Sequence, residues 1–341
     1  MKKTVSFVLG ILLVVGLLSA SAGSALADSA TETKKLHIVT TILPVYDWVV
    51  NVLGDQSDSA ELTMLLDTGV DLHSYQPTVE DIVKIAGCDL FIYVGGESDE
   101  WVDDALAEAT NKDMVVIDLL EVLGDKVKEE EIVEGMEAEH DHDHDHEEGH
   151  DHAEDHDHEE GEAEFDEHIW LSLKHAGTLS GAIADTLVQL DPANANSYRT
   201  NADAYAEKLN TLDAQYRAAV DAAPVKTLLF GDRFPFRYLA DDYGLDYYAA
   251  FAGCSAETEA SFQTIIFLAN KLDELGLPAV LQIESADGSI ARTIVENTKS
   301  RSQQILTLDS MQSVTAKDVA AGTSYLAVME KNLDVLKAAL G

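Results

Sequence analysis

Eight histidines alternate with acidic residues in one stretch of this chain, a pattern typical of metal chelation. They lie between residues 140 and 158, inside the window 129–167, which has 21 acidic residues and no lysine or arginine. Repulsion among these carboxylates predicts a disordered insertion over about 126–164, in which any chelating imidazole pair must lose conformational entropy. We therefore expect weak, exchangeable auxiliary metal sites, because the alternative, a purely solubilising acidic linker, would need no histidine. The eight residues are His140, His142, His144, His146, His150, His152, His156 and His158.

Two other histidines and three acidic residues stand where a single tight metal site can form. His73 follows one apolar run, and His168 precedes a helix-like segment. Asp232, Glu284 and Asp309 each end an apolar run in the second half of the chain. Parallel α/β sheets place their ligand sites at the carboxyl ends of strands. Two neutral imidazoles that meet carboxylates there would suit a borderline divalent ion such as zinc.

Each of these residues also has a plainer interpretation, which the spacing leaves open. His73 can be a loop or surface histidine, and His168 can lie in a segment that caps the next helix. Asp309 can cap a helix, and Glu284 can pair with a nearby lysine or arginine. The metal interpretation requires that these side chains converge on one cleft.

The elements that must position these residues are short apolar runs that alternate with helical patterns. Alternation of this kind is typical of α/β folds with parallel strands. We predict two similar lobes, one over 28–190 and one over 224–341, and a closing amphipathic helix over 326–340. The predicted strands are 36–41, 61–67, 90–95, 114–118, 226–232, 245–251, 279–284 and 304–309.

One long amphipathic helix is predicted between the lobes, over 191–223. Its apolar positions recur at spacings of four and three residues, which places them in a single stripe. Asp191 and Pro192 can begin the helix, and Pro224 lies just beyond its end. About 27 residues at 1.5 Å each give roughly 40 Å, so the helix should act as a rigid strut. The stripe consists of Tyr198, Ala202, Tyr205, Leu209, Leu212, Tyr216, Ala219 and Ala223.

The first residues and the net charge indicate a compartment and exclude some partners. Lys2 and Lys3, an apolar run over 5–18 and small residues up to Ala27 have the form of a secretory signal peptide over 1–27. The apolar run is too short to span a bilayer comfortably, and no cysteine near Ala27 can carry a lipid anchor. We expect an exported protein, periplasmic, extracellular or at the cell surface. The formal net charge of -41 argues against nucleic acid and anionic membranes as partners.

The cysteines and the catalytic motifs give no enzyme signature. An exported chain permits a disulfide between Cys88 and Cys254, but Cys88 precedes an apolar run, as a buried thiol would. Cys254 lies in a loop-like segment where a weak ligand role is conceivable. No predicted helix carries an H-E-x-x-H motif, and the chain has no G-x-S-x-G elbow or Walker A loop. We therefore predict that the protein is not an enzyme.

Several segments together resemble the solute-binding proteins of zinc and manganese ABC importers, over essentially the whole chain after the signal peptide. VTTILPVYDWV resembles the family's first strand and helix, GVDLHSYQP its first ligand loop, and DEHIWLS its second ligand segment. TLDSM followed by TSYLAVMEKNLDVLKAAL resembles its C-terminal end, and a histidine-rich insertion is common in the zinc branch. The resemblance implies an α/β fold with two (β/α)₄ lobes joined by a long rigid backbone helix, with the metal site in the cleft between the lobes.

Matched residue by residue, the resemblance implies three metal ligands. His73 and His168 fall on the two ligands of the first lobe, and Asp309 falls on the aspartate that completes the site from the second lobe. The family's remaining ligand is a histidine in the zinc branch or a glutamate in the manganese branch. Arg233 stands at that position in this chain.

The chain departs from the family pattern at two places. Arg233 has no lone pair for a metal, so we expect Asp232, one residue earlier, to be the ligand. Glu167, Ser172 and Leu173 stand where the family's second ligand motif has proline, aspartate and proline. The alternatives to Asp232 are Glu257, Glu259, Cys254 and a water molecule.

The resemblance further implies an exported monomer that binds Zn²⁺ and delivers it to an ABC importer, that is, a membrane permease with its cytoplasmic ATPase. Mn²⁺ is the alternative ligand, favoured by the carboxylates and disfavoured by the histidine-rich stretch. That stretch would act as a low-affinity collector of zinc. A stand-alone zinc store or metallochaperone and a secreted zinc hydrolase are the alternatives from other functional classes.

Overall fold

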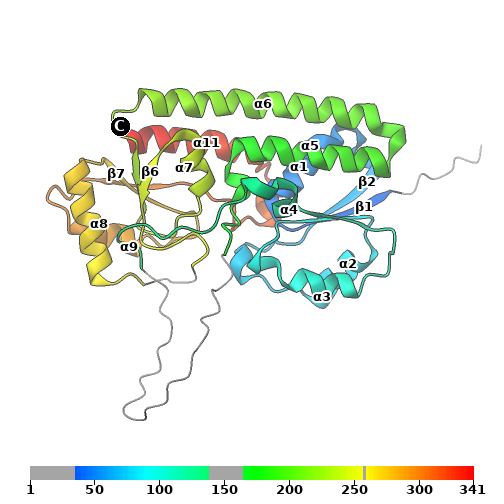
Figure 1. Ribbon diagram of the computed structural model, residues 1–341, viewed down its shortest axis with the longest axis horizontal. Helices are drawn as coiled ribbons and strands as arrows, with labels where there is room; N and C mark the ends of the chain where they lie inside the picture. Colours follow the sequence, from blue (N-terminus) through cyan, green and yellow to red (C-terminus); the bar gives the residue numbers. More distant parts are fainter. Residues whose placement is uncertain (1–34, 138–163, 256–258) are drawn as a thin grey trace, which may run out of the picture. The chain divides into compact units, whose positions relative to one another are not determined.

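The structure, a computed structural model, describes residues 35–137, 164–255 and 259–341 (Figure 1). The predicted signal peptide over 1–27 and the eight histidines between 140 and 158 lie outside these residues. None of the described helices is both long enough and apolar enough to cross a membrane.

The N-terminal lobe is built around a parallel sheet with the strand order β2-β1-β3-β4. Its β-branched and aromatic residues suit a sheet that is covered on both faces, and Phe91 and Ile92 of β3 are fully buried. The four strands predicted for this half are confirmed, with ends that differ by a few residues. The elements are β1 (Leu36–Thr40), α1 (Leu43–Leu53), β2 (Ala60–Met64), α2 (Val79–Gly87), β3 (Leu90–Tyr93), α3 (Trp101–Ala107), β4 (Val115–Asp118) and α4 (Leu119–Leu123).

The C-terminal lobe contains the other four predicted strands, but as two parallel pairs, β5-β6 and β7-β8. One parallel bridge between Phe230 and Leu281 links the pairs. They do not form one continuous ladder because the Asp232 side chain, rather than a backbone carbonyl, accepts the hydrogen bond from Ile283 N–H at 3.1 Å. The elements are β5 (Thr227–Leu229), α7 (Arg237–Tyr243), β6 (Asp246–Tyr248), α8 (Phe262–Leu275), β7 (Ala279–Gln282), α9 (Ser289–Glu296), β8 (Gln304–Thr307), α10 (Ala316–Ala320) and α11 (Tyr325–Leu340).

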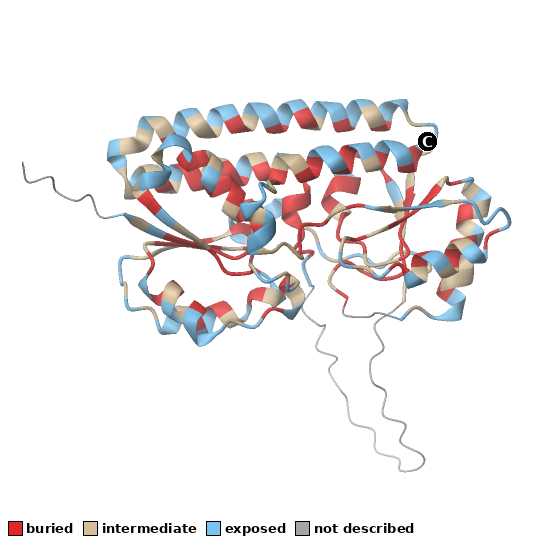
Figure 2. Ribbon diagram, turned by 180° about the vertical axis from the view of Figure 1, so that it is seen from behind, coloured by how far each residue is buried: buried red, intermediate tan, exposed pale blue. Residues whose placement is uncertain are grey.

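Two long helices, α5 (Leu173–Leu190) and α6 (Ala195–Ala222), lie between the lobes in the sequence, and α6 packs against α1, α5 and α11 (Figure 1). Tyr216 Oη of α6 donates a hydrogen bond to Met329 O of α11 at 2.6 Å, so the helix also contacts the second lobe. Buried residues recur along α6, as the predicted stripe requires (Figure 2). Ala202, Ala219 and Ala223 of the predicted stripe are partly buried and pack against the same core. The buried residues are Tyr198, Tyr205, Leu209, Leu212, Tyr216 and Val220.

The first part of the predicted disordered insertion, residues 127–137, is described and contacts the C-terminal lobe. Glu137 N–H donates a hydrogen bond to Ala250 O at 2.9 Å, and Met136 packs against the hydrophobic core. The prediction that residues 126–164 have little to bury is therefore wrong for this part. The reason is that its few apolar side chains find a surface on a lobe that lies far away in the sequence.

Candidate metal centre

His73 lies at the carboxyl edge of the first-lobe sheet, in a single 3₁₀ turn, Leu72–Ser74, that follows β2. Asp71 Oδ1 accepts a hydrogen bond from His73 N–H at 3.0 Å, which fixes the start of this turn. The ring Nδ1 lies 2.7 Å from Ser98 Oγ, in the loop that follows β3. Two loops at the same edge of the sheet therefore hold the imidazole in place.

His168 precedes the 3₁₀ turn Ile169–Leu171 and helix α5, and it is fully buried. Asp166 Oδ1 accepts a hydrogen bond from His168 N–H at 2.9 Å and lies 3.0 Å from the ring Nδ1. Because an ionised carboxylate only accepts hydrogen bonds, Nδ1 carries a proton and Nε2 is the atom available to a metal. Trp170 Nε1–H donates to Ser310 O at 2.9 Å, which ties this segment to the C-terminal lobe.

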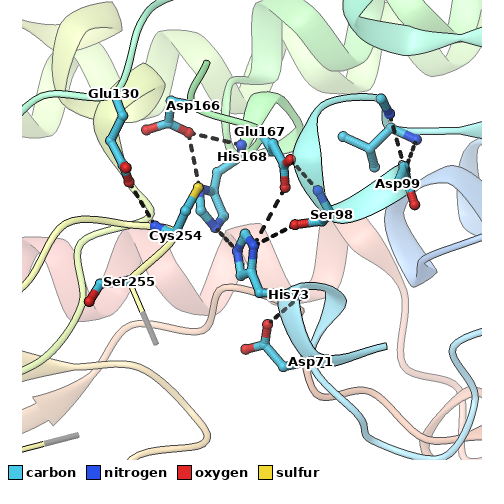
Figure 3. Close-up of polar contacts among 12 residues, drawn as sticks. Asp71, His73, Ser98, Asp99, Glu130, Asp166, Glu167, His168, Cys254 and Ser255 are labelled. Carbon is cyan, nitrogen blue, oxygen red and sulfur yellow. Dashed lines mark hydrogen bonds and ion pairs between the residues drawn. The ribbon is translucent and has the colours of Figure 1, made fainter. Parts of the chain in front are cut away.

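The two imidazoles point toward one another (Figure 3). Their Nε2 atoms are 3.0 Å apart, and the ring centroids are 5.0 Å apart. Two N–H groups cannot point at each other at this distance, so at least one of the two Nε2 atoms carries no proton. When both rings carry their proton on Nδ1, both Nε2 lone pairs face one point. Such a pair is a donor set that zinc accepts.

Glu167 is placed to accept a hydrogen bond from His73 Nδ1–H in that state. Its Oε2 lies 3.5 Å from His73 Nδ1, is buried, and has no hydrogen-bond partner among the described residues. Its Oε1 accepts a hydrogen bond from Ser98 N–H at 2.8 Å, which positions the carboxylate. Burial raises the pKa of the Glu167 carboxyl. An unsatisfied acceptor beside Nδ1 is the kind of partner that orients a metal-binding histidine.

We expect the metal-free protein to lose stability as the pH falls below the usual histidine pKa of about 6.5. Burial and the neighbouring His168 lower the pKa of His73 to about 3 in the folded protein. Between these two values the unfolded chain binds a proton that the folded protein does not, so the free energy of unfolding decreases toward acid. Urea denaturation at neutral pH and near pH 4 should show a drop that His73→Gln reduces by more than about 1 kcal/mol. An equal drop in both proteins would contradict this assignment.

A third metal-ligating side chain lies beside the imidazole pair. Among the described residues, His73, His168 and Cys254 form a group in which a ring nitrogen of each histidine and the sulfur all lie within 4.8 Å of one another (Figure 3). Cys254 N–H donates a hydrogen bond to Glu130 Oε1 at 2.8 Å. Burial and the Glu130 carboxylate raise the pKa of the Cys254 thiol. Both Cys254 and Cys88 are free thiols, so the two do not form a disulfide.

Asp232, the predicted substitute ligand, lines the same cleft of about 480 Å³ as His73. Its carboxylate accepts hydrogen bonds from Arg233 N–H at 2.8 Å and from Ile283 N–H at 3.1 Å. Asp232 is not part of the three-residue group. Its role as a ligand stays a prediction, and it requires the carboxylate to turn away from these backbone groups.

Asp309, the predicted ligand at the end of β8, accepts a hydrogen bond from Met311 N–H at 2.8 Å. Burial and the nearby Glu284 raise the pKa of Asp309 to about 6. Glu284 accepts hydrogen bonds from Ser310 N–H at 2.7 Å and from Gln312 N–H at 2.9 Å. Both acids therefore stabilise the loop after β8, and the structure does not bring Asp309 into the three-residue group. Its role as a ligand also stays a prediction.

Arg233 stands across the cleft from the imidazoles and pairs with the first lobe. Its Nη2 lies 2.7 Å from Asp71 Oδ2, in an ion pair whose side chains are both largely buried. Burial alone would raise the pKa of Asp71, but the charge and hydrogen bond of Arg233 and the hydrogen bond from His73 N–H outweigh it and lower that pKa. With its amide oriented to satisfy both neighbours, Gln312 donates to Asp71 at 3.0 Å, and its oxygen lies 3.2 Å from His168 Nε2.

Three neighbours of the imidazoles are not predicted from the sequence. Ser98 follows a Gly-Gly pair at the end of β3, and this position at the sheet edge is a signal that could have found it. Glu167 is recognised only as a departure from a family proline. Nothing in the spacing of the sequence indicates that Gln312 lies at the site.

A family model described as "Zinc-uptake complex component A periplasmic" (ZnuA) matches residues 38–339. The chain is 30% identical over 307 residues to "Zinc-binding protein AdcA" of Streptococcus pyogenes serotype M3, an alignment that covers 89% of this chain and 56% of the relative. It is 28% identical over 326 residues to "High-affinity zinc uptake system protein ZnuA" of Bacillus subtilis, covering 95% of this chain and 94% of that protein.

Solved structures show the same fold. The Zn(II)-bound ZnuA-like domain of Streptococcus pneumoniae AdcA is similar with a TM-score of 0.66 and 29% identity, covering 90% of this chain and 99% of that one. The metal-dependent lipoprotein YcdH of Bacillus subtilis has a TM-score of 0.69 and 26% identity, with 90% and 99% coverage. The chain thus spans about half the length of the AdcA relatives, 56%, and nearly all of the ZnuA-like domain.

Proposed function

The chain belongs to the ZnuA family of zinc-uptake complex components, and from this membership we propose that it captures Zn²⁺ outside the cytoplasm and delivers it to an ABC importer. The ion would be cargo that is bound and released without chemical change. Its receiver would be a membrane permease that works with a cytoplasmic ATPase, and the binding protein would act as a monomer.

The observation that carries this proposal is the pair of the partly buried His73 and the fully buried His168, with their Nε2 atoms 3.0 Å apart. The lowered pKa of His73 keeps its imidazole unprotonated at neutral pH, so the ring can bind a metal there. Imidazole nitrogens suit zinc, whereas manganese prefers carboxylate and carbonyl oxygens. The carboxylates of Asp232 and Asp309, which would favour manganese, are held by backbone N–H groups.

Metal analysis combined with chelator competition tests the proposal. We expect one tightly bound zinc per chain that manganese does not displace at equal concentration. Cells that lack the protein should take up zinc slowly when zinc is scarce and should recover when it is added. Preferential manganese binding would contradict the zinc assignment. Normal zinc uptake in such cells would instead support a stand-alone store or metallochaperone.

We propose that Asp309 completes the site when zinc is bound, and Asp232 is the first candidate for the remaining ligand, ahead of its alternatives Glu257, Glu259, Cys254 and water. If so, Asp309→Ala and Asp232→Ala should each weaken zinc binding by about tenfold or more, because a lost ligand costs at least as much as a lost outer-shell partner. Asp287→Ala is the matched control, since Asp287 lines the same cleft and is exposed. Competition titration with a zinc-selective dye measures all three variants. An affinity equal to that of the control would remove the residue from the ligand set.

We propose that the eight histidines between 140 and 158 collect zinc at low affinity near the cleft. The flanks of this stretch pair with each other, since Glu130 N–H donates to Glu164 O at 2.8 Å, so a deletion should remove only residues 138–163. Equilibrium dialysis should then show that the weak sites vanish while one tight site remains. The weak sites of the intact protein should empty as imidazoles protonate near pH 6.5. Unchanged stoichiometry and uptake after the deletion would contradict the collector role.

A further inference from the structure

We infer that Cys254 binds zinc from the C-terminal lobe in place of Asp232, so that a thiolate joins the two imidazoles and Asp309 in holding the cargo. This inference rests on the proposed capture of zinc and specifies its donor atoms. The sulfur of Cys254 differs from the nitrogen and oxygen ligands that the family resemblance implies. Four features support the inference: a close backbone approach, a fixed position, the hydrogen bonds that already hold the Asp232 carboxylate, and the chemistry of sulfur.

The backbone before Cys254 approaches the His168 ring more closely than a side chain would allow. A Cβ added to Gly253 would lie 3.1 Å from His168 Cε1 and 3.0 Å from Phe234 O, tighter than ordinary contacts. Glycine at this position therefore lets the chain of the second lobe pass directly against the imidazole of the first. The next residue is Cys254, and this approach brings its sulfur to the pair of histidines.

Hydrogen bonds fix the segment on both sides of the thiol. Before it, the backbone N–H of Phe251 donates to Asp232 O at 3.3 Å. At the residue itself, Cys254 N–H donates to Glu130 Oε1, an acceptor from the segment that precedes the histidine-rich stretch. Cys254 and His73 both line the 480 Å³ cleft, so an ion that enters the cleft meets both. The thiol is thus positioned by its backbone, and its sulfur also interacts with the Glu130 carboxylate and the Glu167 backbone.

Asp232, the carboxylate expected to replace the family's ligand, is held by backbone groups. Arg233 stands in the place of that ligand and pairs with Asp71, and Asp232 accepts hydrogen bonds from the N–H groups of Arg233 and Ile283. Around a tetrahedral zinc, with Zn–N of about 2.0–2.1 Å and Zn–S of about 2.3 Å, neighbouring donor atoms lie roughly 3.3–3.6 Å apart. The two ring nitrogens and the Cys254 sulfur already lie within 4.8 Å of one another, so they need to move by about an ångström to bind one zinc. A rotation of one side chain provides that shift.

Sulfur at this position would select the cargo. As the zinc–sulfur bond forms, the thiol proton passes to solvent, and the bound thiolate is a soft donor. Soft thiolates favour zinc and thiophilic ions over manganese and magnesium. Cys254 would therefore exclude manganese from a cleft whose walls also carry carboxylates.

Cobalt substitution of the full chain tests this inference. The chain has two cysteines, Cys88 and Cys254, and none lies in the histidine-rich stretch, so thiolate-to-cobalt charge-transfer absorption reports only these two. With one equivalent of Co²⁺, the native protein and Cys88→Ser should show this absorption, and Cys254→Ser should not. Cys88→Ser is the matched control because Cys88 is a buried free thiol of the first lobe. We also expect Cys254→Ser to weaken zinc binding by roughly 10–100-fold, and Cys254→Asp to lose selectivity against manganese.

Two results would overturn the inference: no thiolate absorption in the native cobalt protein, or zinc affinity in Cys254→Ser equal to that of Cys88→Ser. His168→Ala, measured in parallel with residues 138–163 removed from every protein compared for zinc affinity, separates this failure from failure of the proposed function. If His168→Ala loses zinc and Cys254→Ser does not, zinc capture stands and only the thiolate is wrong. If neither variant loses zinc, the site itself is wrong.

Discussion

His168→Ala should lower the zinc affinity of this protein by at least about 100-fold. Zinc sites with four protein ligands contribute apparent binding free energies of roughly 10–16 kcal/mol, so one ligand is worth on the order of 3 kcal/mol. His168 is fully buried, and Asp166 orients its ring, so no other side chain can replace it without a rearrangement. The measurement is chelator competition with residues 138–163 removed, because the histidines there would mask the loss.

His37→Ala is the control for this result. His37 lies on β1 of the same lobe, its side chain is exposed, and its Nε2 is 3.8 Å from Glu61. We expect this variant to bind zinc as the native protein does. Circular dichroism should show that both variants are folded. A folded His168→Ala variant that keeps one tightly bound zinc would refute the site described here.

Trp170→Ala should destabilise the protein by about 3–5 kcal/mol, as truncation of a buried aromatic residue does. Trp170 is 1% exposed and lies two residues after His168. Its Nε1–H donates to Ser310 O at 2.9 Å, and its own carbonyl accepts from Tyr325 Oη of α11 at 2.6 Å. It therefore joins the segment of the first-lobe ligand to two segments of the second lobe. Urea denaturation of the metal-free protein measures the loss.

Two further variants separate packing from hydrogen bonding at Trp170. Trp170→Phe keeps most of the packing and should cost less than Trp170→Ala, with about 1–3 kcal/mol from the unsatisfied Ser310 carbonyl. Phe262→Ala removes an aromatic ring that is 72% exposed and should change stability by less than about 0.5 kcal/mol. If Trp170→Ala were no more destabilising than Phe262→Ala, the contact between the lobes would not depend on this side chain.

Local patterns in the sequence suffice to predict the helices and strands of the fold. Each strand is a short apolar run between polar segments, and α6 shows its buried stripe through spacings of four and three residues. These patterns depend on residues close together in the chain, so they can be read without knowing the tertiary contacts. The positions of His73 and His168 follow in the same way, because His73 comes after strand β2 and His168 comes before helix α5.

Contacts between residues far apart in the sequence decide which other groups lie beside these histidines. An aspartate at the end of a strand can bind a metal or accept a backbone hydrogen bond, and its sequence context is the same in both cases. Asp232 and Asp309 accept backbone hydrogen bonds in this structure, a choice set by where Ile283 N–H and Met311 N–H lie. Spacing along the chain contains no information about that choice.

The sequence of the first half is enough to predict the strands of its sheet and the places of His73 and His168. The sequence of the second half is enough to predict its strands and helices. The approach of Gly253 and Cys254 to His168, and the folding of residues 127–137 onto the second lobe, arise only when the two lobes pack together. Such contacts join residues far apart in the sequence, and their geometry depends on the summed packing of all the elements between them. For that reason the imidazole pair is predictable from the sequence, whereas the sequence offers Cys254 only as one of several alternative donors and the folded protein places its sulfur beside the pair.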